Sequence, residues 1–338
     1  MMSKTFRRWL VDQPQLLPPS VQEFVPTGHV AHFIREMVRE DLDLSAILNT
    51  YAELRGYPPF DPRMMTALLL YGYSRGVYSS RRLAQACEER LDFMAVTAMN
   101  RPDFRTVSEF RRRHLDALSG LFVQVLKLCQ KAKLVELGDV ALDGTKMKAN
   151  ASKHKAMSYG RMKKTEPELA AEVDGWLKAA VDAKAQVIVA HGLTDCAVDC
   201  GQLVGMVDAI KDNTGQTPAQ ISADNGYCSE ANIQAMEDRK IDAYIATGRH
   251  KHGQAAADGG NRTTPKTAEM RERLRKDGFD GPYRRRKQTV EPVFGQIKHA
   301  RGFRQFLMRG LKKVTAEWAM LCTVHNILKL AGHVAATA

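Results

Sequence analysis

Residues 139–149 read DVALDGTKMKA, and this stretch decides the fold because the chain changes character here. Its side chains alternate along the run, which is typical of a β-strand. Helix-like stretches at 201–213 and 229–240 separate further short β-rich runs, which are bounded by turn residues and lie at 186–194, 219–224 and 242–248. Strands that alternate with helices predict an α/β layer domain, which we place at residues 138–338.

The chain before this strand reads as helical, and no strand pattern competes with that interpretation. Asp61 stands as an N-cap before a proline at the start of one helix. Thr106 and Glu109 fit a capping box that opens a single long helix over residues 106–132. Three basic residues make the N-terminal part of this helix positive and are predicted to contact DNA: Arg111, Arg112 and Arg113. We therefore expect a helical, basic domain over residues 1–137.

The chain after the β-rich runs returns to a helical pattern. Residues 249–280 are rich in Gly, Lys, Arg and Thr, which favours an exposed connection. C-terminal helices are then predicted over residues 290–333, with a break around 302–310. Pro292 suits the first position of a helix, and this places Glu291 near the N-cap.

Composition indicates an acidic partner and excludes a membrane span. The chain has 50 Lys and Arg against 38 Asp and Glu, a formal charge of +12, which favours nucleic acid as the partner. No apolar run approaches the roughly 20 residues of a membrane helix, and the N-terminus lacks a signal sequence. We expect a cytoplasmic protein. The six cysteines are scattered and predict reduced thiols without a metal.

Three carboxylates stand out by position. Asp143 and Asp224 lie at the ends of predicted strands, where ligand sites gather in open α/β sheets, although either alone also reads as a turn residue. Glu291 is the only acidic residue between 281 and 313, a segment that carries ten Lys or Arg residues. A carboxylate embedded in a phosphate-binding surface suits metal-assisted phosphodiester chemistry. Two Mg²⁺ or Mn²⁺ ions, roughly 4 Å apart, can hold the attacking and leaving oxygens of such a reaction.

At this point the sequence resembles the DDE transposases of bacterial insertion sequences, which have an RNase H-like catalytic core. The likeness is carried by segments 140–164, 220–233, 242–253 and 290–330. Residues 101–114, RPDFRTVSEFRRRH, also resemble the helical DNA-binding domain that precedes this core. The resemblance implies an RNase H-like domain preceded by an all-helical DNA-binding domain.

The resemblance also implies roles for individual residues. Asp143, Asp224 and Glu291 match the metal-binding triad, and Lys298 matches a lysine that contacts DNA near the cleaved end. The family further places a Tyr and an Arg ahead of the glutamate. Tyr283 and Arg286 have the right mutual spacing but lie one residue too far from Glu291, and Arg284 and Lys287 occupy the strict positions. Two further residues of this basic segment are predicted to contact DNA: Arg301 and Arg304.

The segment between residues 150 and 186 is shorter than the resemblance predicts. Residues 166–185 read largely as helix, so the second strand of the core has no convincing match beyond the short run 177–183, LKAAVDA. A missing central strand would expose its neighbours.

Three functions remain open. The first is an active transposase that binds terminal inverted repeats, cleaves the element ends and joins them to target DNA, with at least a homodimer in the synaptic complex. The second is a decayed or domesticated protein that binds DNA without activity. The third is a nuclease with the same core. The intact triad favours the first, and the short central segment favours the second.

Overall fold

The N-terminal part of the chain is a bundle of short helices, as the sequence predicts. The computed structural model describes residues 20–51, 59–148, 174–194, 200–248, 264–277 and 281–337. Asp61 caps the most buried of these helices by accepting a hydrogen bond from the Arg63 N–H. The helical elements in chain order are η1 (Val21–Phe24), α1 (Val30–Glu40), α2 (Ser45–Leu48), α3 (Pro62–Ser74), α4 (Ser80–Glu89), α5 (Leu91–Thr97), α6 (Phe104–Arg113) and α7 (Leu115–Lys131).

The single long helix predicted over residues 106–132 is wrong, because the chain breaks between α6 and α7 at His114. The His114 ring is buried, packs against Phe110 and lies 3.2 Å from the Tyr51 hydroxyl. These contacts hold its backbone outside the helical region. The predicted capping box is also absent, since Asp103 caps α6.

A five-stranded mixed sheet follows the helices. Its order is β3-β2-β1-β4-β5. Strand β2 is antiparallel to both of its neighbours, β1 and β3, whereas β4 is parallel to both of its neighbours, β1 and β5. Two helices, α9 (Leu203–Thr214) and α10 (Glu230–Asp238), connect the later strands. The strands are β1 (Asp139–Lys148), β2 (Asp174–Asp182), β3 (Ile188–Thr194), β4 (Gln220–Ala223) and β5 (Asp242–Ile245). This order and these directions agree with the RNase H-like core predicted from the sequence.

The second core strand is present, and it includes most of the short run 177–183, the one match that the sequence offered. Residues 174–182, which read as helix in the sequence, form β2, an inner strand between β3 and β1, and pair with β1 from Val140 to Lys148. Both faces of β2 are covered, so that consecutive side chains from Leu177 to Asp182 are all buried. A strand buried on both faces does not show the alternating pattern by which a half-exposed strand is found.

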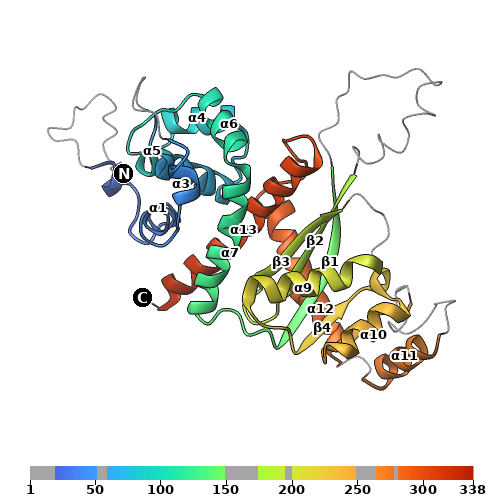
Figure 1. Cartoon of the computed structure of the whole chain (residues 1–338). Helices are drawn as coiled ribbons and strands as arrows, with labels where there is room; N and C mark the ends of the chain where they lie inside the picture. Colours follow the sequence, from blue (N-terminus) through green and yellow to red (C-terminus); the bar gives the residue numbers. More distant parts are fainter. Residues whose placement is uncertain are drawn as a thin grey trace, which may run out of the picture.

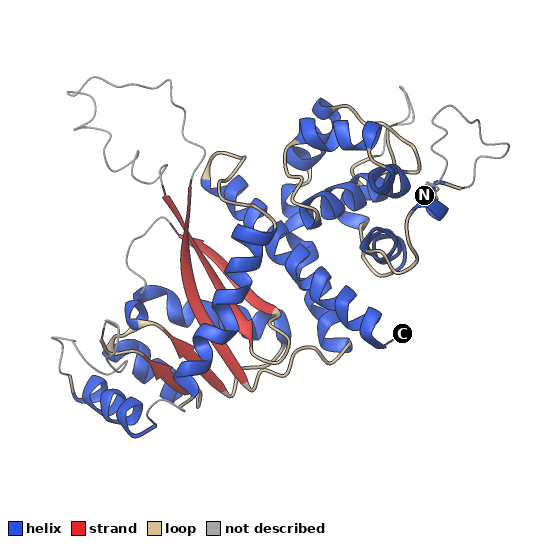
Figure 2. Ribbon diagram, turned by 180° about the vertical axis from the view of Figure 1, so that it is seen from behind, coloured by secondary structure: helices blue, strands red, loops and turns tan. Residues whose placement is uncertain are grey.

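Helices cover both faces of the sheet. Helix α9 lies over one face, in front of the strands in Figure 1, where Met206 approaches Gly192. Helices α12 (Pro282–Gly295) and α13 (Leu311–Thr337) cover the other face, which is turned forward in Figure 2. A short helix, α11 (Pro265–Asp277), packs beside α10 and β5.

The C-terminal helical region begins at Pro282, eight residues before the predicted start. Glu291 therefore lies inside α12, and the predicted N-cap position is wrong. Pro292 is tolerated because the carbonyl of Gln288, which would accept its missing N–H, accepts the Gln186 side-chain amide instead at 3.0 Å. A π-helix, η5 (Gln296–Ala300), continues directly from α12.

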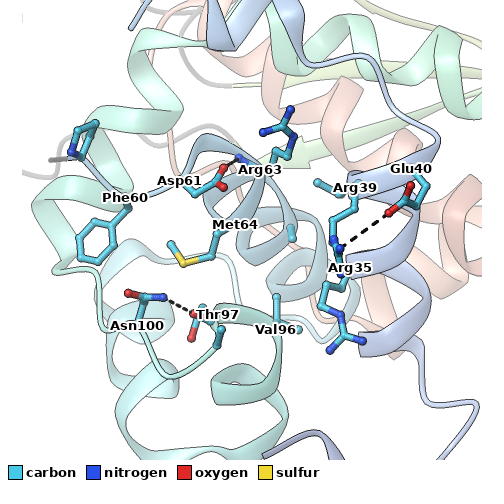
Figure 3. A pocket seen from close by; sticks show the side chains of 14 residues that line it. Arg35, Arg39, Glu40, Phe60, Asp61, Arg63, Met64, Val96, Thr97 and Asn100 are labelled. Carbon is cyan, nitrogen blue, oxygen red and sulfur yellow. Dashed lines mark hydrogen bonds and ion pairs between the residues drawn. The ribbon is translucent and has the colours of Figure 1, made fainter. Parts of the chain in front are cut away.

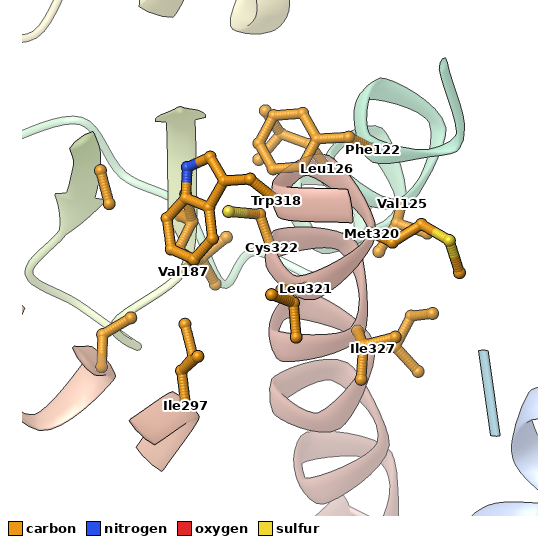
Figure 4. Close-up of a cluster of buried hydrophobic side chains, with 14 of the residues drawn as sticks. Phe122, Val125, Leu126, Val187, Ile297, Trp318, Met320, Leu321, Cys322 and Ile327 are labelled. Carbon is orange, nitrogen blue, oxygen red and sulfur yellow. The ribbon is translucent and has the colours of Figure 1, made fainter. Parts of the chain in front are cut away.

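Helix α13 joins the two parts of the molecule. Trp318 is fully buried and donates from its indole nitrogen to the carbonyl of Lys178 in β2 at 3.2 Å. Asn326 bonds both backbone groups of Ile188 in β3. Figure 4 shows α13 between Val187 and Ile297 on one side and residues of α7 on the other. The helical part and the sheet therefore share one continuous hydrophobic core. Within the described residues, no helix is long and apolar enough to cross a membrane.

Candidate active site

Two of the three predicted carboxylates lie on neighbouring parallel strands, just beyond the last paired residues of β1 and β4: Asp143 in the middle of β1, and Asp224 directly after β4. Leu142 of β1 pairs with Ala223 of β4, and Asp143 and Asp224 are the next residues. Each carboxylate accepts a nearby backbone N–H, Asp143 from Gly144 at 2.8 Å and Asp224 from Gly226 at 2.9 Å. Burial raises the pKa of Asp143, and the negative charge of Asp224 raises it further. The strand pairing thus concentrates negative charge at one point of the sheet.

Arg286 of α12 neutralises part of this charge. Its guanidinium lies 3.0 Å from the Asp143 carboxylate, and the two side chains are only 8% and 17% exposed. The same guanidinium lies 5.6 Å from the centre of the Tyr283 ring. Burial raises the pKa of Tyr283, and the two aspartates raise it further against the opposing effect of Arg286. Tyr283 and Arg286 therefore belong to the carboxylate site, whereas Arg284 and Lys287 are exposed on α12.

Glu291 is not part of this cluster. Its side chain is exposed, and its neighbour Val290 takes the buried position on α12. Among the described residues, no three His, Cys, Asp or Glu side chains lie close enough together to hold a metal ion. The structure thus brings Asp143 and Asp224 together and leaves Glu291 outside.

Lys298 reaches the same strand from the π-helix. Its ammonium group donates to the Thr145 hydroxyl and, at 2.9 Å, to the carbonyl of Lys146. Thr145 is two residues after Asp143 and so shares its face of β1. Burial lowers the pKa of Lys298. Sequence reasoning named Lys298 but gave no sign of Thr145 as its partner.

The helix register explains why Glu291 is excluded. In an α-helix each residue turns by about 100°, so residues three, four or seven apart share a face. The spacing from Arg286 to Glu291 is five residues, one more than the pattern of the resemblance. A π-helical turn holds one residue more than an α-helical turn, and here it lies after Glu291. The extra residue turns Lys298 toward the face of Arg286 and leaves Glu291 between them on another face.

The two arginines that follow have different surroundings. Arg301 is largely buried, lies 3.3 Å from the His325 ring nitrogen and donates to the Gln296 carbonyl at 3.3 Å. Burial lowers the pKa of Arg301. Arg304 is exposed; it donates to the Lys298 carbonyl at 3.4 Å and lies 3.2 Å from a ring nitrogen of His299. The contacts with His325 and Gln296 give Arg301 a structural role, and its predicted contact with DNA stays a prediction.

The three arginines of α6 lie in its last turn, whereas the sequence predicted them near a helix entrance. Arg111 is 5% exposed and donates to the Tyr73 hydroxyl, the Tyr78 carbonyl and the Ser80 hydroxyl at 3.0 to 3.1 Å. Its burial corrects the prediction of a DNA contact. Arg112 and Arg113 are both exposed; Arg112 pairs with Glu109, and Arg113 donates to the Thr50 carbonyl.

Sequence reasoning also missed Lys178, a buried lysine on β2 opposite Gly144. Its ammonium group lies 5.3 Å from the centre of the Tyr227 ring. A single lysine within the apolar run 177–181 was the available signal. Residues 149–164, which carry the rest of the first-aspartate segment, lie outside the described residues.

The helical part has a groove of its own. It is lined by residues of α1, α3 and α5, by residues 59–61 just before α3, and by Ala98 and Asn100 just after α5. Figure 3 shows Arg35, Arg39 and Arg63 on one side of this groove and Phe60 and Asn100 on the other. Its volume is about 820 Å³. Glu40 and Asp61 also line it, so its charge is mixed, and none of the three carboxylates of the predicted triad contributes to it.

Comparison with known families agrees with this arrangement. A family model described as "Transposase DDE domain" matches residues 226–331, which include α12, Glu291 and Lys298. A second, described as "Transposase domain (DUF772)", matches residues 19–113 of the helical part. Together the two models cover more than half of the chain. No curated protein gives a significant match. With both transposase domains in this order and the mixed sheet between them, the chain belongs to the DDE transposases of insertion sequences.

Proposed function

We propose that this transposase cleaves the ends of its element and joins them to target DNA, with Asp143, Asp224 and Glu291 as its catalytic carboxylates. The observation that carries the proposal is the pair Asp143 and Asp224, placed side by side by the parallel pairing of β1 and β4. A partly buried pair of like charges is unfavourable by itself, so its presence favours a functional reason.

The donor set fits a divalent metal ion. Carboxylate oxygens are the ligands that Mg²⁺ and Mn²⁺ prefer, and a cation would relieve the repulsion between the two aspartates. We propose that Asp143 and Asp224 hold such ions, two in the reacting complex, with Glu291 as the third ligand. The ions would activate water or a DNA 3′-hydroxyl and stabilise charge on the scissile phosphate.

The chain's own cations would position the DNA. Arg286 and Lys298 flank the Asp143 face of β1, and Tyr283 lies beside Arg286. A guanidinium can bind a phosphate through two parallel hydrogen bonds, and a lysine can bind it as a point charge. We propose that these groups hold the phosphodiester next to the carboxylates, with Arg304 at the exposed edge.

Glu291 can join Asp143 and Asp224 only if the helical register of α12 changes. Moving the extra residue of the π-helix to a position between Arg286 and Glu291 would turn Arg286, Glu291 and Lys298 toward a common face. Single π-turns often lie at functional sites, and this one follows Glu291 by five residues. We propose that DNA or metal binding drives this shift.

A DNA-binding protein without activity is the second possibility, and the exposed position of Glu291 favours it. In either case we propose that residues 1–137 form the DNA-binding domain and residues 138–338 the catalytic domain. Because two element ends must be held together during transposition, we propose that a homodimer acts in the synaptic complex.

The test is cleavage of a labelled duplex that carries the element ends, with Mg²⁺ or Mn²⁺ present or removed by EDTA. Wild type is compared with Asp143→Asn, Asp224→Ala and Glu291→Gln, and with Glu88→Gln, an exposed carboxylate of α4, as the control. We expect each triad variant to lose at least ~10²-fold in rate and the control to lose nothing. Binding without cleavage by wild type in both metals would refute the catalytic proposal and favour the second one.

A further inference from the structure

An exposed cluster of arginines surrounds one aromatic ring on the helical part. Phe104, the first residue of α6, is 38% exposed. The guanidinium carbon of Arg81, from α4, lies 5.2 Å from the centre of its ring, and that of Arg105 lies 5.6 Å from it. Two more exposed arginines adjoin them in sequence, Arg82 and Arg101. We call these five residues the Phe104 patch.

The positive charge of the Phe104 patch is not neutralised within the described part of the chain. There, none of its four guanidinium groups forms an ion pair, whereas Arg90 and Arg112 nearby each pair with a carboxylate. The one acidic residue within the patch sequence, Asp103, accepts hydrogen bonds from backbone and hydroxyl groups of α6 as its N-cap. Arg105 also lowers the pKa of Asp103 by its charge, but the four guanidinium groups outnumber this one carboxylate, and their excess positive charge favours an anionic ligand.

The aromatic ring gives the cluster a fixed geometry. A guanidinium over a ring face gains about 0.5–1 kcal/mol at an exposed site, and its freedom falls. Phe104 therefore holds two guanidinium groups in place before any ligand binds. Such preorganisation lowers the entropy that binding costs. Planar guanidinium groups match the geometry of phosphate oxygens.

We propose that the Phe104 patch binds the phosphate backbone of double-stranded DNA. This inference rests on the proposed function, because it takes the element DNA as the ligand. It adds a second surface to the predicted contacts of Arg112 and Arg113, since Arg111, predicted with them, is buried. Backbone contacts of this kind fix the position of a duplex without reading its sequence.

The place of the patch in the molecule supports a continuous DNA path. Figure 1 shows α4 and α6 at the same end of the molecule as the N-terminal end of α13. The loop before α13 carries two exposed arginines, Arg304 and Arg309, and follows the π-helix with Lys298. A duplex lying across this end of the molecule would contact the Phe104 patch first and the catalytic domain next.

The test measures binding of a fluorescent duplex of mixed sequence by anisotropy at increasing salt, without divalent metal. The variant is Arg81→Ala with Arg105→Ala. The matched control is Arg39→Ala with Arg63→Ala, which removes the same charge from the groove of Figure 3. Each lost phosphate contact lowers the slope of log affinity against log salt by about 0.9, so we expect a fall of about 2 for the patch variant and none for the control. Phe104→Leu should weaken binding about two- to fivefold.

The outcomes separate this inference from the proposed function. All substituted residues, Phe104 included, have exposed or groove-lining side chains, and circular dichroism checks that each variant is folded. If wild type binds and the patch variant keeps its affinity and slope, or if the groove variant alone loses them, the inference is overturned while DNA binding stands. If wild type fails to bind any duplex, including one with the element ends, the proposed function itself fails.

Discussion

Replacing Arg286 by Gln removes the only cation that forms an ion pair with Asp143 among the described residues. Breaking a fully buried ion pair costs roughly 3–5 kcal/mol, because the remaining charge loses its partner. Here the side chains of Arg286 and Asp143 are 8% and 17% exposed, so that solvent reaches the pair. We therefore expect Arg286→Gln to lower the free energy of unfolding by about 2–4 kcal/mol at neutral pH.

This loss should depend on pH. Burial raises the pKa of Asp143 above its ordinary value of 3.8, and Arg286 is the strongest influence that lowers it. A carboxyl group with a raised pKa binds its proton more tightly in the folded state, so its contribution to stability falls as pH rises from 3.8 through the folded pKa. Without Arg286 the pKa of Asp143 in the folded state rises further, so the contribution of Asp143 to stability keeps falling up to a higher pH. The destabilisation should therefore be small in acid and reach its full size near neutral pH.

The assay is urea unfolding at several pH values in EDTA, with Lys287→Gln as the control. Lys287 is the next residue of α12 and is exposed, so its variant should unfold like wild type at every pH. Adding Mn²⁺ should restore part of the stability of Arg286→Gln, because the ion replaces the lost cation. A loss below about 1 kcal/mol, or one of equal size at every pH, would refute the assignment of an ion pair at the carboxylate site.

Three further predictions concern the packing of the two parts. Gly76→Ala should destabilise more than Gly215→Ala in urea unfolding: both residues have left-handed backbones at φ +73° and +77°, but only at Gly76 does the added Cβ meet a carbonyl, that of Arg301 at 2.7 Å. Equal losses would contradict the close approach. Glu317→Gln should reduce the fall in stability between pH 4.5 and neutral, because burial raises the pKa of Glu317 and the folded state holds its proton more tightly; an unchanged pH profile would count against this. Trp318→Ala should cost about 3–5 kcal/mol, because it leaves a cavity in the shared core, and a loss below ~1 kcal/mol would mean that the site collapses around it.

The sequence predicted the strands whose ends are marked by turn residues. The run at 139–149 became β1, and those at 219–224 and 242–248 became β4 and β5, each close to its predicted limits. Turn residues end these runs, and such signals are local. The inner strand β2 was not predictable in this way, because both of its faces are buried and its alanines favour a helix equally well.

The start of α12 was mispredicted for a related reason. Pro292 inside a helix leaves an unsatisfied carbonyl, and only Gln186, more than a hundred residues away in the chain, supplies the missing partner. No local sequence pattern predicts such a contact. Long-range hydrogen bonds of this kind decide where a helix tolerates a proline.

The candidate site was predictable in part. Asp143 and Asp224 were singled out by predicted positions at strand ends; Asp224 does follow β4, whereas Asp143 lies in the middle of β1, where the parallel pairing of β1 with β4 ends. The choice between Arg286 and Lys287 was not predictable, because it depends on which face of α12 meets the sheet. The burial of Arg111 was equally invisible, since it depends on Tyr73, Tyr78 and Ser80 from an earlier segment.

The place of α13 has a consequence for synthesis. This helix packs against α3 and α7 of the helical part and against β3 of the sheet, yet it is translated after every other described element. Until α13 has left the ribosomal exit tunnel, both the helical part and the sheet of a nascent chain therefore lack the helix that packs against them. Neither half can complete its core earlier, so folding of the two is tied to the same late event. Interrupted translation would release chains with exposed apolar surface rather than a folded helical half.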